Sequence, residues 1–375
     1  MATQSFLLLS FPLLTTKYPG GTSMKISATP FGKLPDGREV TCYTLEQGAI
    51  KVEILNYGGI VRGLYLPDQR GKVADVVLGH KDLDAYLENK GSLGCAVGRN
   101  TNRISGASFR LFDQKVDLAA NDGANNLHSG PNGLSGRLFA AEVHTFNNLP
   151  ALLLSHTIEE GSDGFPGNLI VTIAYALTED NALMIDYRAV SDKNTVINLT
   201  NHSYFNLGGH DSGNVYGHIL ELDAPFYTPG NAECIPTGEI LKVKDTPFDF
   251  FTAPKAIGRD IHSALTQISQ YGGYDHNFVL RGVGYRKIAT LTDPESGRVM
   301  KVHTDLPGVQ LYTGNHFDGE TAHKDGVVYP KHAGVCLETQ FFPNTPNTPW
   351  FPSVFFAAGE DYTFTTTYQF STVED

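Results

Sequence analysis

Two polar side chains that interrupt apolar, strand-like runs are the residues of this chain best suited to move protons. His202 lies within residues 198–209, and Glu338 lies within residues 334–343. An imidazole titrates near neutrality, so it can both give and take a proton. A carboxylate is uncommon in an apolar strand because burial penalises its charge, and such groups concentrate at active sites. The pattern predicts acid–base chemistry, against the alternative that Glu338 is a structural acid paired with an arginine.

Four further runs carry polar groups where the core of a sheet would be apolar, at residues 98–104, 125–130, 273–279 and 307–315. The first run offers two guanidiniums and two amides, and a guanidinium fork binds carboxylates or sugar hydroxyls with fixed geometry. The alternative is a loop whose arginines pair with structural acids. Because buried polar groups cost free energy unless they are satisfied, several such clusters together favour a binding site.

The sequence motifs do not indicate other chemistries. No two of the 13 histidines stand four residues apart, and no acidic run resembles a calcium loop. The chain has no phosphate-binding loop, dinucleotide fingerprint or Gly-x-Ser-x-Gly motif. A net charge of −12 argues against a nucleic-acid partner, which needs a basic face. We therefore expect a small-molecule substrate, no metal and no cofactor.

Alternating and apolar runs predict many strands and few helices. Strands are expected at residues 50–55, 115–118, 169–175, 183–189 and 362–370. The third and fourth of these form a predicted hairpin, and residues 82–89 and 256–270 are the best candidates for short helices. Because strands and helices never alternate regularly, a parallel βαβ fold is disfavoured. We predict an all-β fold, a large antiparallel β-sandwich with few short helices.

The N-terminus and the cysteines bear on where the chain works. Residues 1–23 contain a short apolar stretch that no basic residue precedes, and we interpret them as a leader or extended start, with a secreted form as the alternative. No linker divides residues 24–375, so they are expected to form a single domain. No apolar run reaches membrane length. Four widely spaced cysteines make no disulfide framework, which favours the cytoplasm.

The six polar runs together resemble the aldose 1-epimerase (galactose mutarotase) family, from about Ile26 to the C-terminus. The matching segments include Asn-Tyr-Gly-Gly at 56–59, Asp-Val-Val-Leu-Gly at 75–79, Gly-Phe-Pro-Gly at 164–167, Asn-His-Ser-Tyr-Phe-Asn-Leu at 201–207 and Leu-Glu-Thr-Gln at 337–340. The resemblance implies a galactose mutarotase-like supersandwich with an open sugar cleft. It also implies an enzyme that interconverts the α and β anomers of free hexoses, such as glucose and galactose.

The same resemblance implies a role for each matching residue. His202 is the expected general acid, Glu338 the expected general base, and His128 a second active-site histidine. The expected substrate-binding residues are Asn102, Arg103, Ser203, Tyr204, Asp275 and Gln310. Two positions depart from the family pattern. Ser129 stands where a glycine is usual, and Thr101 stands where a smaller residue is usual, so we expect both to bear on sugar preference.

In the expected reaction, Glu338 takes the proton of the C1 hydroxyl while protonated His202 donates to the ring oxygen. The ring opens to an aldehyde, the C1–C2 bond rotates, and closure reverses both proton transfers. This chemistry requires a low pKa for Glu338 and a raised pKa for His202 at the working pH.

Three alternatives to this function stay open at the level of sequence. The first is a non-catalytic sugar-binding module. The second is a hexose-6-phosphate 1-epimerase, for which Arg99 is the spare cation that could hold a phosphate. The third is a glycoside hydrolase with Asp275 and Glu338 as its two carboxylates. The preferred sugar, and whether the chain is a monomer or a homodimer, are also left open.

Overall fold

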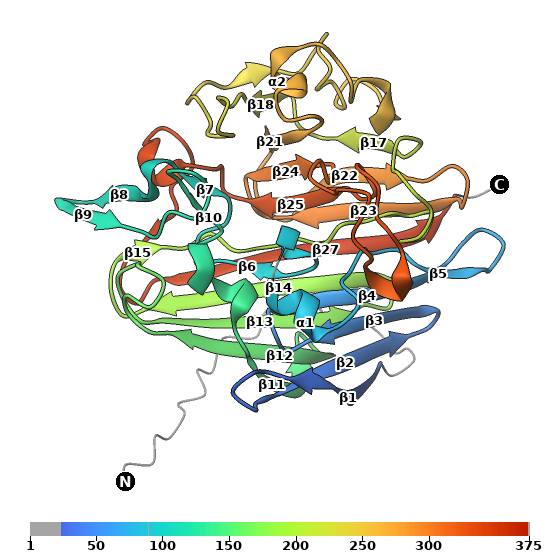
Figure 1. Cartoon of the computed structure of the whole chain (residues 1–375), viewed down its shortest axis with the longest axis horizontal. Helices are drawn as coiled ribbons and strands as arrows, with labels where there is room; N and C mark the ends of the chain where they lie inside the picture. Colours follow the sequence, from blue (N-terminus) through green and yellow to red (C-terminus); the bar gives the residue numbers. More distant parts are fainter. Residues whose placement is uncertain (1–23, 89, 374–375) are drawn as a thin grey trace.

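A computed structural model describes residues 24–88 and 90–373 of the chain (Figure 1). The predicted all-β fold is confirmed, because the regular secondary structure of the described chain is dominated by antiparallel sheets, with only two short α-helices. The leader interpreted at residues 1–23 lies outside the described residues. Among the residues that are described, no helix has the length and apolar character needed to cross a bilayer.

A nine-stranded antiparallel sheet crosses the molecule. In spatial order its strands are β11 (Ala140–Phe146), β12 (Leu149–Ile158), β13 (Leu169–Leu177), β14 (Ala182–Ser191), β27 (Asp361–Thr372), β23 (Arg298–Thr304), β22 (Arg286–Thr292), β17 (Ile219–Leu222) and β20 (Lys255–Ala256). The predicted hairpin is β13 and β14. Its turn closes at Asn181, whose φ of 60° is a left-handed conformation that asparagine tolerates well.

Two five-stranded sheets accompany the large one. The first is a meander of consecutive strands: β1 (Lys25–Lys33), β2 (Glu39–Gln47), β3 (Ile50–Leu55), β4 (Ile60–Pro67) and β5 (Val73–Asp75). The second, which carries Glu338, has the order β19 (Leu241–Lys242), β18 (Phe226–Thr228), β21 (Asp275–Val279), β24 (Gly308–Tyr312) and β25 (Cys336–Gln340). We call the second one the site sheet.

Short strand pairs and single helical turns complete the described chain. The pairs are β6 (Ala96–Val97) with β16 (Thr200–Asn201), β7 (Arg103–Ile104) with β10 (Asn126–Leu127), β8 (Ser108–Leu111) with β9 (Gln114–Asp117), and β15 (Thr195–Val196) with β26 (Phe355–Phe356). The 3₁₀ turns are η1 (Lys90–Ser92), η2 (Ser105–Ala107), η3 (Gly130–Asn132), η4 (Leu134–Gly136), η5 (Ile257–Arg259), η6 (Lys324–Gly326) and η7 (Thr345–Asn347).

The two predicted helices have different outcomes. Helix α1 (Leu83–Glu88) forms as expected within residues 82–89. The prediction for residues 256–270 is wrong over most of its length, since only α2 (Thr266–Ser269) is α-helical there. The reason is tertiary: the start of this segment adds β20 to the edge of the large sheet, where Ala256 pairs with Ile219. Strand pairing therefore overrides the local helical pattern.

Both five-stranded sheets pack on the large sheet and share one hydrophobic core with it. On the side of the first sheet, the hydroxyl of Tyr175 in β13 donates to the carbonyl of Gly59 at 2.7 Å. On the other side, the hydroxyl of Tyr368 in β27 donates to the carbonyl of Leu337 in β25 at 3.3 Å. Each buried aliphatic or aromatic side chain in such a core contributes about 1.5–3 kcal/mol. Packing on the large sheet therefore fixes the position of β25.

Candidate active site

Strand β25 fixes the position of Glu338. Alternation along the strand turns Leu337 toward the large sheet and Glu338 to the opposite face, where Glu338 is 2% exposed. In the adjacent strand β24, Gln310 is the direct cross-strand partner of Glu338. The site sheet therefore presents an amide and a carboxylate side by side.

His202 reaches the same place from the turn that follows β16. Its backbone N–H donates to the carbonyl of Cys95 at 2.8 Å, which continues the pairing with the β6 side. The strand ends because Ser203 donates both its N–H, at 3.1 Å, and its hydroxyl, at 2.6 Å, to Oδ1 of Asn201. Such a local side-chain bond competes with strand pairing.

The chain around His202 does not continue as an extended strand. An extended strand would place Thr200, His202 and Tyr204 on one face, but β16 stops at Asn201. The rings of His202 and Tyr204 still meet, stacked with centroids 4.9 Å apart and planes at 23°. The turn, rather than a pleated face, brings the imidazole against the tyrosine.

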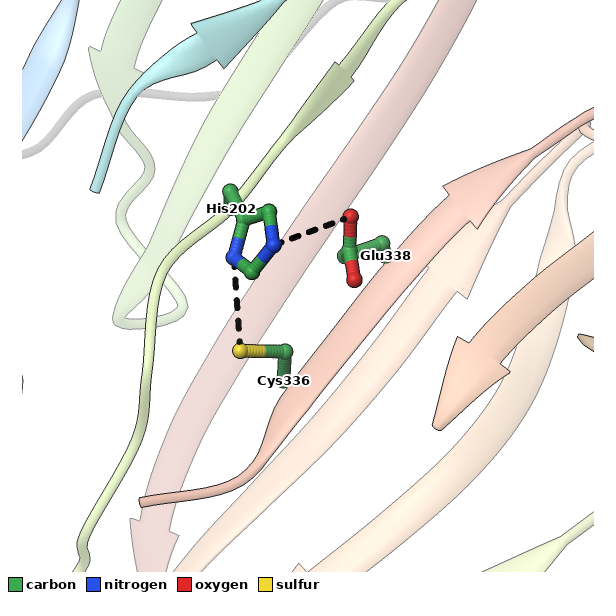
Figure 2. A group of neighbouring side chains, drawn as sticks. All are labelled: His202, Cys336 and Glu338. Atoms are coloured by element: carbon green, nitrogen blue, oxygen red, sulfur yellow. Dashed lines mark hydrogen bonds and ion pairs between the residues drawn. The ribbon is translucent and has the colours of Figure 1, made fainter. Parts of the chain in front are cut away.

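The imidazole and the carboxylate meet across these two elements (Figure 2). Nε2 of His202 lies 3.7 Å from Oε2 of Glu338, and both side chains are almost fully buried. Oε2 has no hydrogen-bond partner within residues 24–88 and 90–373. On the other side of the ring, Nδ1 lies 3.5 Å from Sγ of Cys336. An acid–base pair with one unsatisfied oxygen is poised to act on a third group.

Burial reverses the pKa shifts expected for this pair, so that expectation is wrong for the site without sugar. Burial lowers the pKa of His202 to about 4. Burial raises the pKa of Glu338 well above its usual range; the charge of Asp275 adds to this rise, and Arg103 opposes it. Removal from water disfavours the charged form of each group. Both shifts favour the neutral form of each group.

His128 stands beside His202 and is held as a neutral donor. The backbone N–H of Asn102 donates to Nδ1 of His128 at 3.1 Å, so the proton of the neutral ring sits on Nε2. The rings of His128 and His202 are 5.5 Å apart and nearly perpendicular. Burial lowers the pKa of His128 well below its usual range, and the neighbouring His202 and Arg103 lower it further. A neutral histidine with a fixed Nε2–H can donate to a sugar oxygen.

The remaining polar residues form two hydrogen-bonded groups. Nε2 of Gln310 donates to Oδ1 of Asp275 at 2.7 Å, across β21 and β24. Nε of Arg103 donates to Oδ2 of Asp122 at 2.7 Å. Arg103 and Asp275 are only partly buried and both act electrostatically on Glu338. The structure therefore gathers these residues around the buried pair.

Ser203 and Tyr204 are brought to the site but are committed to other partners. The hydroxyl of Ser203 donates to Asn201, and the hydroxyl of Tyr204 donates to the carbonyl of Gly91 at 2.7 Å. Both residues are 3% exposed. Their contacts hold the turn that carries His202.

Arg99 is not placed to bind a phosphate. Its side chain is fully buried, and Nε donates to Oδ2 of Asp163 at 3.0 Å. Nη1 donates to the carbonyls of Pro166 and Gly167 and to the hydroxyl of Thr195. Arg99 therefore pairs with a structural acid, which is the alternative to a binding role for this run of residues.

Sequence reasoning missed two residues of the site, Cys336 and Asp122. Alternation along β25 puts Cys336 on the face of Glu338, but nothing in the sequence points to its contact with His202. Asp122 gave no local signal, because its bond to Arg103 depends on how β7 and β10 approach each other.

Comparison with known proteins agrees with this geometry. Residues 41–369 match the family model described as aldose 1-epimerase. The galactose mutarotase of Bos taurus is 39% identical over 350 residues, which cover 93% of this chain and 99% of that protein. The galactose mutarotase of Homo sapiens is 38% identical, with 92% of this chain and 98% of that protein covered. The aldose 1-epimerase of Escherichia coli is 34% identical, with 90% and 96% covered.

Solved structures give the same result. A galactose 1-epimerase from Lactobacillus acidophilus superposes with a TM-score of 0.82 at 27% identity, covering 94% of this chain and all of that one. An aldose epimerase homologue from C. elegans superposes with a TM-score of 0.79 at 28% identity, covering 87% of this chain and 97% of that one. The agreement extends over nearly the whole of each chain.

Proposed function

The chain belongs to the aldose 1-epimerase family, and from this premise we propose that His202 and Glu338 are its catalytic acid and base. The enzyme is an isomerase that interconverts the α and β anomers of free hexoses. The observation that carries our assignment is the 3.7 Å approach of Nε2 to Oε2. Two groups this close can reach two oxygens bound to one carbon.

Glu338 takes the proton of the C1 hydroxyl while His202 donates a proton to the ring oxygen through Nε2. The C1–O5 bond breaks as the C1 carbonyl forms, and rotation about C1–C2 exposes the other carbonyl face. On closure, the carbonyl oxygen regains a proton from Glu338 and O5 returns its proton to His202. A positioned acid or base typically contributes about 10²–10⁴-fold to the rate.

Burial lowers the pKa of His202 and raises that of Glu338, which favours the neutral form of both groups, whereas the reaction starts from an imidazolium and a carboxylate. A neutral imidazole with a protonated carboxyl holds the same number of protons as an imidazolium with a carboxylate. Moving one proton from Glu338 to His202 therefore produces the reactive form without exchange with solvent.

We assign the binding of the sugar hydroxyls to Asp275, Gln310, Asn102 and Arg103. Nε2–H of His128 is a further hydrogen-bond donor to the sugar. Hydrogen bonds to hydroxyls remote from C1 hold the sugar still while C1 rotates. Ser203 and Tyr204, which were expected to bind substrate, act instead as positioning residues for His202. The support for this role is that both hydroxyls already have protein partners.

The alternatives fit the site less well. A hexose-phosphate epimerase needs a free cation in the cleft to bind the phosphate. The guanidinium of Arg99 is instead buried and paired with Asp163. A purely sugar-binding module has no need for a buried acid–base pair. A glycoside hydrolase would use Asp275 with Glu338, and release of reducing sugar from a glycoside would reveal it.

For the compartment, we propose the cytoplasm. Three of the four cysteines, Cys42, Cys234 and Cys336, are free thiols. Asn198 and Asn201 begin glycosylation sequons, but both are buried, at 1% and 2% exposure. Cell fractionation with detection of the intact protein tests this proposal, and recovery of a glycosylated form from the secretory route would contradict it.

Polarimetry on freshly dissolved α-glucose tests the catalytic assignment. Glu338→Gln and His202→Asn should each lower kcat by about 10²–10⁴-fold, because each removes one proton-transfer group. Glu53→Gln is the matched control: Glu53 is a half-buried carboxylate of β3 that pairs with Arg62, and its loss should leave kcat unchanged. Sugar binding by Glu338→Gln, measured by calorimetry, should persist. Full activity in that variant would remove Glu338 from the mechanism.

A further inference from the structure

The catalytic pair has a third neighbour whose chemistry the epimerase reaction does not use. Cys336 and Glu338 lie on the same face of β25, where the thiol of Cys336 contacts Nδ1 of His202 and the carboxylate of Glu338 faces Nε2 (Figure 2). One donor atom from each of the three residues lies within 4.8 Å of the other two, and all three residues are buried. An imidazole, a thiol and a carboxylate are the three side-chain types that bind Zn²⁺.

The distances match those of a zinc site. Zinc binds histidine nitrogen at about 2.0–2.1 Å and cysteine sulfur at about 2.3 Å, so tetrahedral geometry holds these two atoms about 3.6 Å apart. Nδ1 of His202 and Sγ of Cys336 are 3.5 Å apart. Their present spacing therefore needs almost no adjustment to become one edge of the tetrahedron.

Glu338 supplies the third ligand. Its Oε2 has no hydrogen-bond partner within the part of the chain that the structure describes, so turning the carboxylate toward the ion breaks no bond there. An unpaired, buried carboxylate oxygen is itself a sign of a missing cationic or hydrogen-bonding partner. The fourth position falls on the side where the sugar is expected, so a water molecule there completes the coordination and blocks the sugar.

A route for a small ion exists beside the site. A cavity of about 620 Å³ is lined by Tyr204 and Tyr312. The same two rings contact His202, at centroid distances of 4.9 Å and 6.2 Å. Charged residues, among them Glu88 and Asp318, also line this cavity.

We propose that His202, Cys336 and Glu338 form an inhibitory Zn²⁺ site inside the catalytic centre. The bound ion occupies the carboxylate that takes the C1 proton and fixes the imidazole that donates to the ring oxygen, so zinc and sugar exclude each other. Formation of the site rests on the three side chains alone; only its inhibitory effect rests on the proposed function.

Two measurements test the proposal. Polarimetry with added ZnCl₂ should show reversible inhibition that EDTA removes and that higher glucose concentrations relieve. Titration with Co²⁺, which adopts similar coordination, should give the near-ultraviolet absorption of a cobalt–thiolate bond, and saturating glucose should abolish it. The cobalt absorption does not depend on catalysis. It therefore shows whether the metal binds even if Glu338 proves not to be the base.

Matched thiol variants locate the ion. Cys336→Ser should raise the Zn²⁺ concentration for half-inhibition by about tenfold or more, relative to its own uninhibited rate, because it loses the soft ligand. Cys42→Ser removes a buried thiol of β2 and should leave zinc sensitivity and activity unchanged. Equal zinc sensitivity in wild type and Cys336→Ser, or absence of the cobalt–thiolate band in wild type, would overturn the proposal. If Cys336→Ser does not fold, displacement of the wild-type band by glucose decides the question.

Discussion

Two buried pairs of opposite type show how the molecule treats charge in its interior. In the first, Nζ of Lys324 donates to Oδ2 of Asp75 at 2.7 Å and to the carbonyls of Arg62 and Val77. Oδ1 of Asp75 accepts two backbone N–H bonds. In the second pair, Nε2 of His202 is 3.7 Å from Glu338, whose Oε2 is unsatisfied within residues 24–88 and 90–373.

The difference separates a structural pair from a reactive one. Lys324 and Asp75 tie η6 to β5, and every donor of the ammonium has an acceptor, so nothing is left to bind a further molecule. The His202 and Glu338 pair leaves an oxygen without a bond, which costs free energy in the folded state. Burial is common to both pairs, and the unsatisfied oxygen of Glu338 is what distinguishes the second pair.

Removing the cation of the structural pair should have the largest effect on stability. Lys324→Met leaves Asp75 buried without its partner, and breaking such a pair costs about 3–5 kcal/mol of unfolding free energy. Chemical denaturation measures this loss. Lys193→Met is the control, because Lys193 and its partner Glu160 are roughly half exposed, and its midpoint should barely move. Equal losses in both variants would erase the distinction between buried and exposed pairs.

Within the site, loss of the Gln310 side chain should weaken catalysis through the sugar grip. Gln310→Ala removes the 2.7 Å bond to Asp275, and a hydrogen bond to a charged group is worth about 1.5–3 kcal/mol, or roughly 10–100-fold in kcat/KM. Steady-state polarimetry measures it. Gln369→Ala breaks a similar but exposed bond to Asp180 and should leave kcat/KM as in wild type. An unchanged kcat/KM in Gln310→Ala would show that Gln310 does not help to bind the sugar.

The reactive pair should also reveal its cost in the pH dependence of stability. The pKa of Glu338 is raised in the folded state, from about 4.3 in the unfolded chain. The folded protein therefore keeps a proton that the unfolded chain has released, and this contribution to stability is lost as pH rises through the folded pKa.

Glu338→Gln lacks this loss, so the variant should gain stability over wild type as pH increases. The gain should be near zero at pH 4 and about 1–3 kcal/mol at pH 8, the cost of an unsatisfied buried group. Thermal unfolding at several pH values measures it. His202 contributes to both proteins: its pKa is lowered, so its share of stability is lost as pH falls and cancels in the comparison. A constant difference across pH would show that Glu338 is ionised in the folded state without penalty.

The smallest effect is expected at Ser129, one of the two departures from the family pattern. Its hydroxyl accepts from the N–H of Asn100 at 2.8 Å and donates to the carbonyl of the same residue at 3.1 Å. Ser129→Gly loses these bonds but relieves a φ of 65°, so we expect a change within about 1 kcal/mol, or about fivefold in kcat/KM. Comparison of glucose with galactose by polarimetry tests whether sugar preference shifts. A reversal of preference would show that Ser129 contacts the sugar.

Local sequence determined several of the strands and pointed to His202 and Glu338, the pair that we propose does the chemistry. Alternation over residues 50–55 matches β3, and the tail strand at residues 362–370 lies inside β27. Such patterns are legible because a strand shows its buried face every second residue. A histidine and a carboxylate inside apolar runs stood out for the same reason, since burial of a polar group needs an explanation.

Only the tertiary structure decided what surrounds those groups. His202 and Cys336 are 134 residues apart, and their contact exists because β16 and β25 lie side by side. The depth of burial reversed the pKa shifts expected for His202 and Glu338, and the packing around Arg99 turned a candidate ligand into a structural residue. Alternation tells which way a side chain points, but solvent access and the partner across the gap depend on distant segments of the chain.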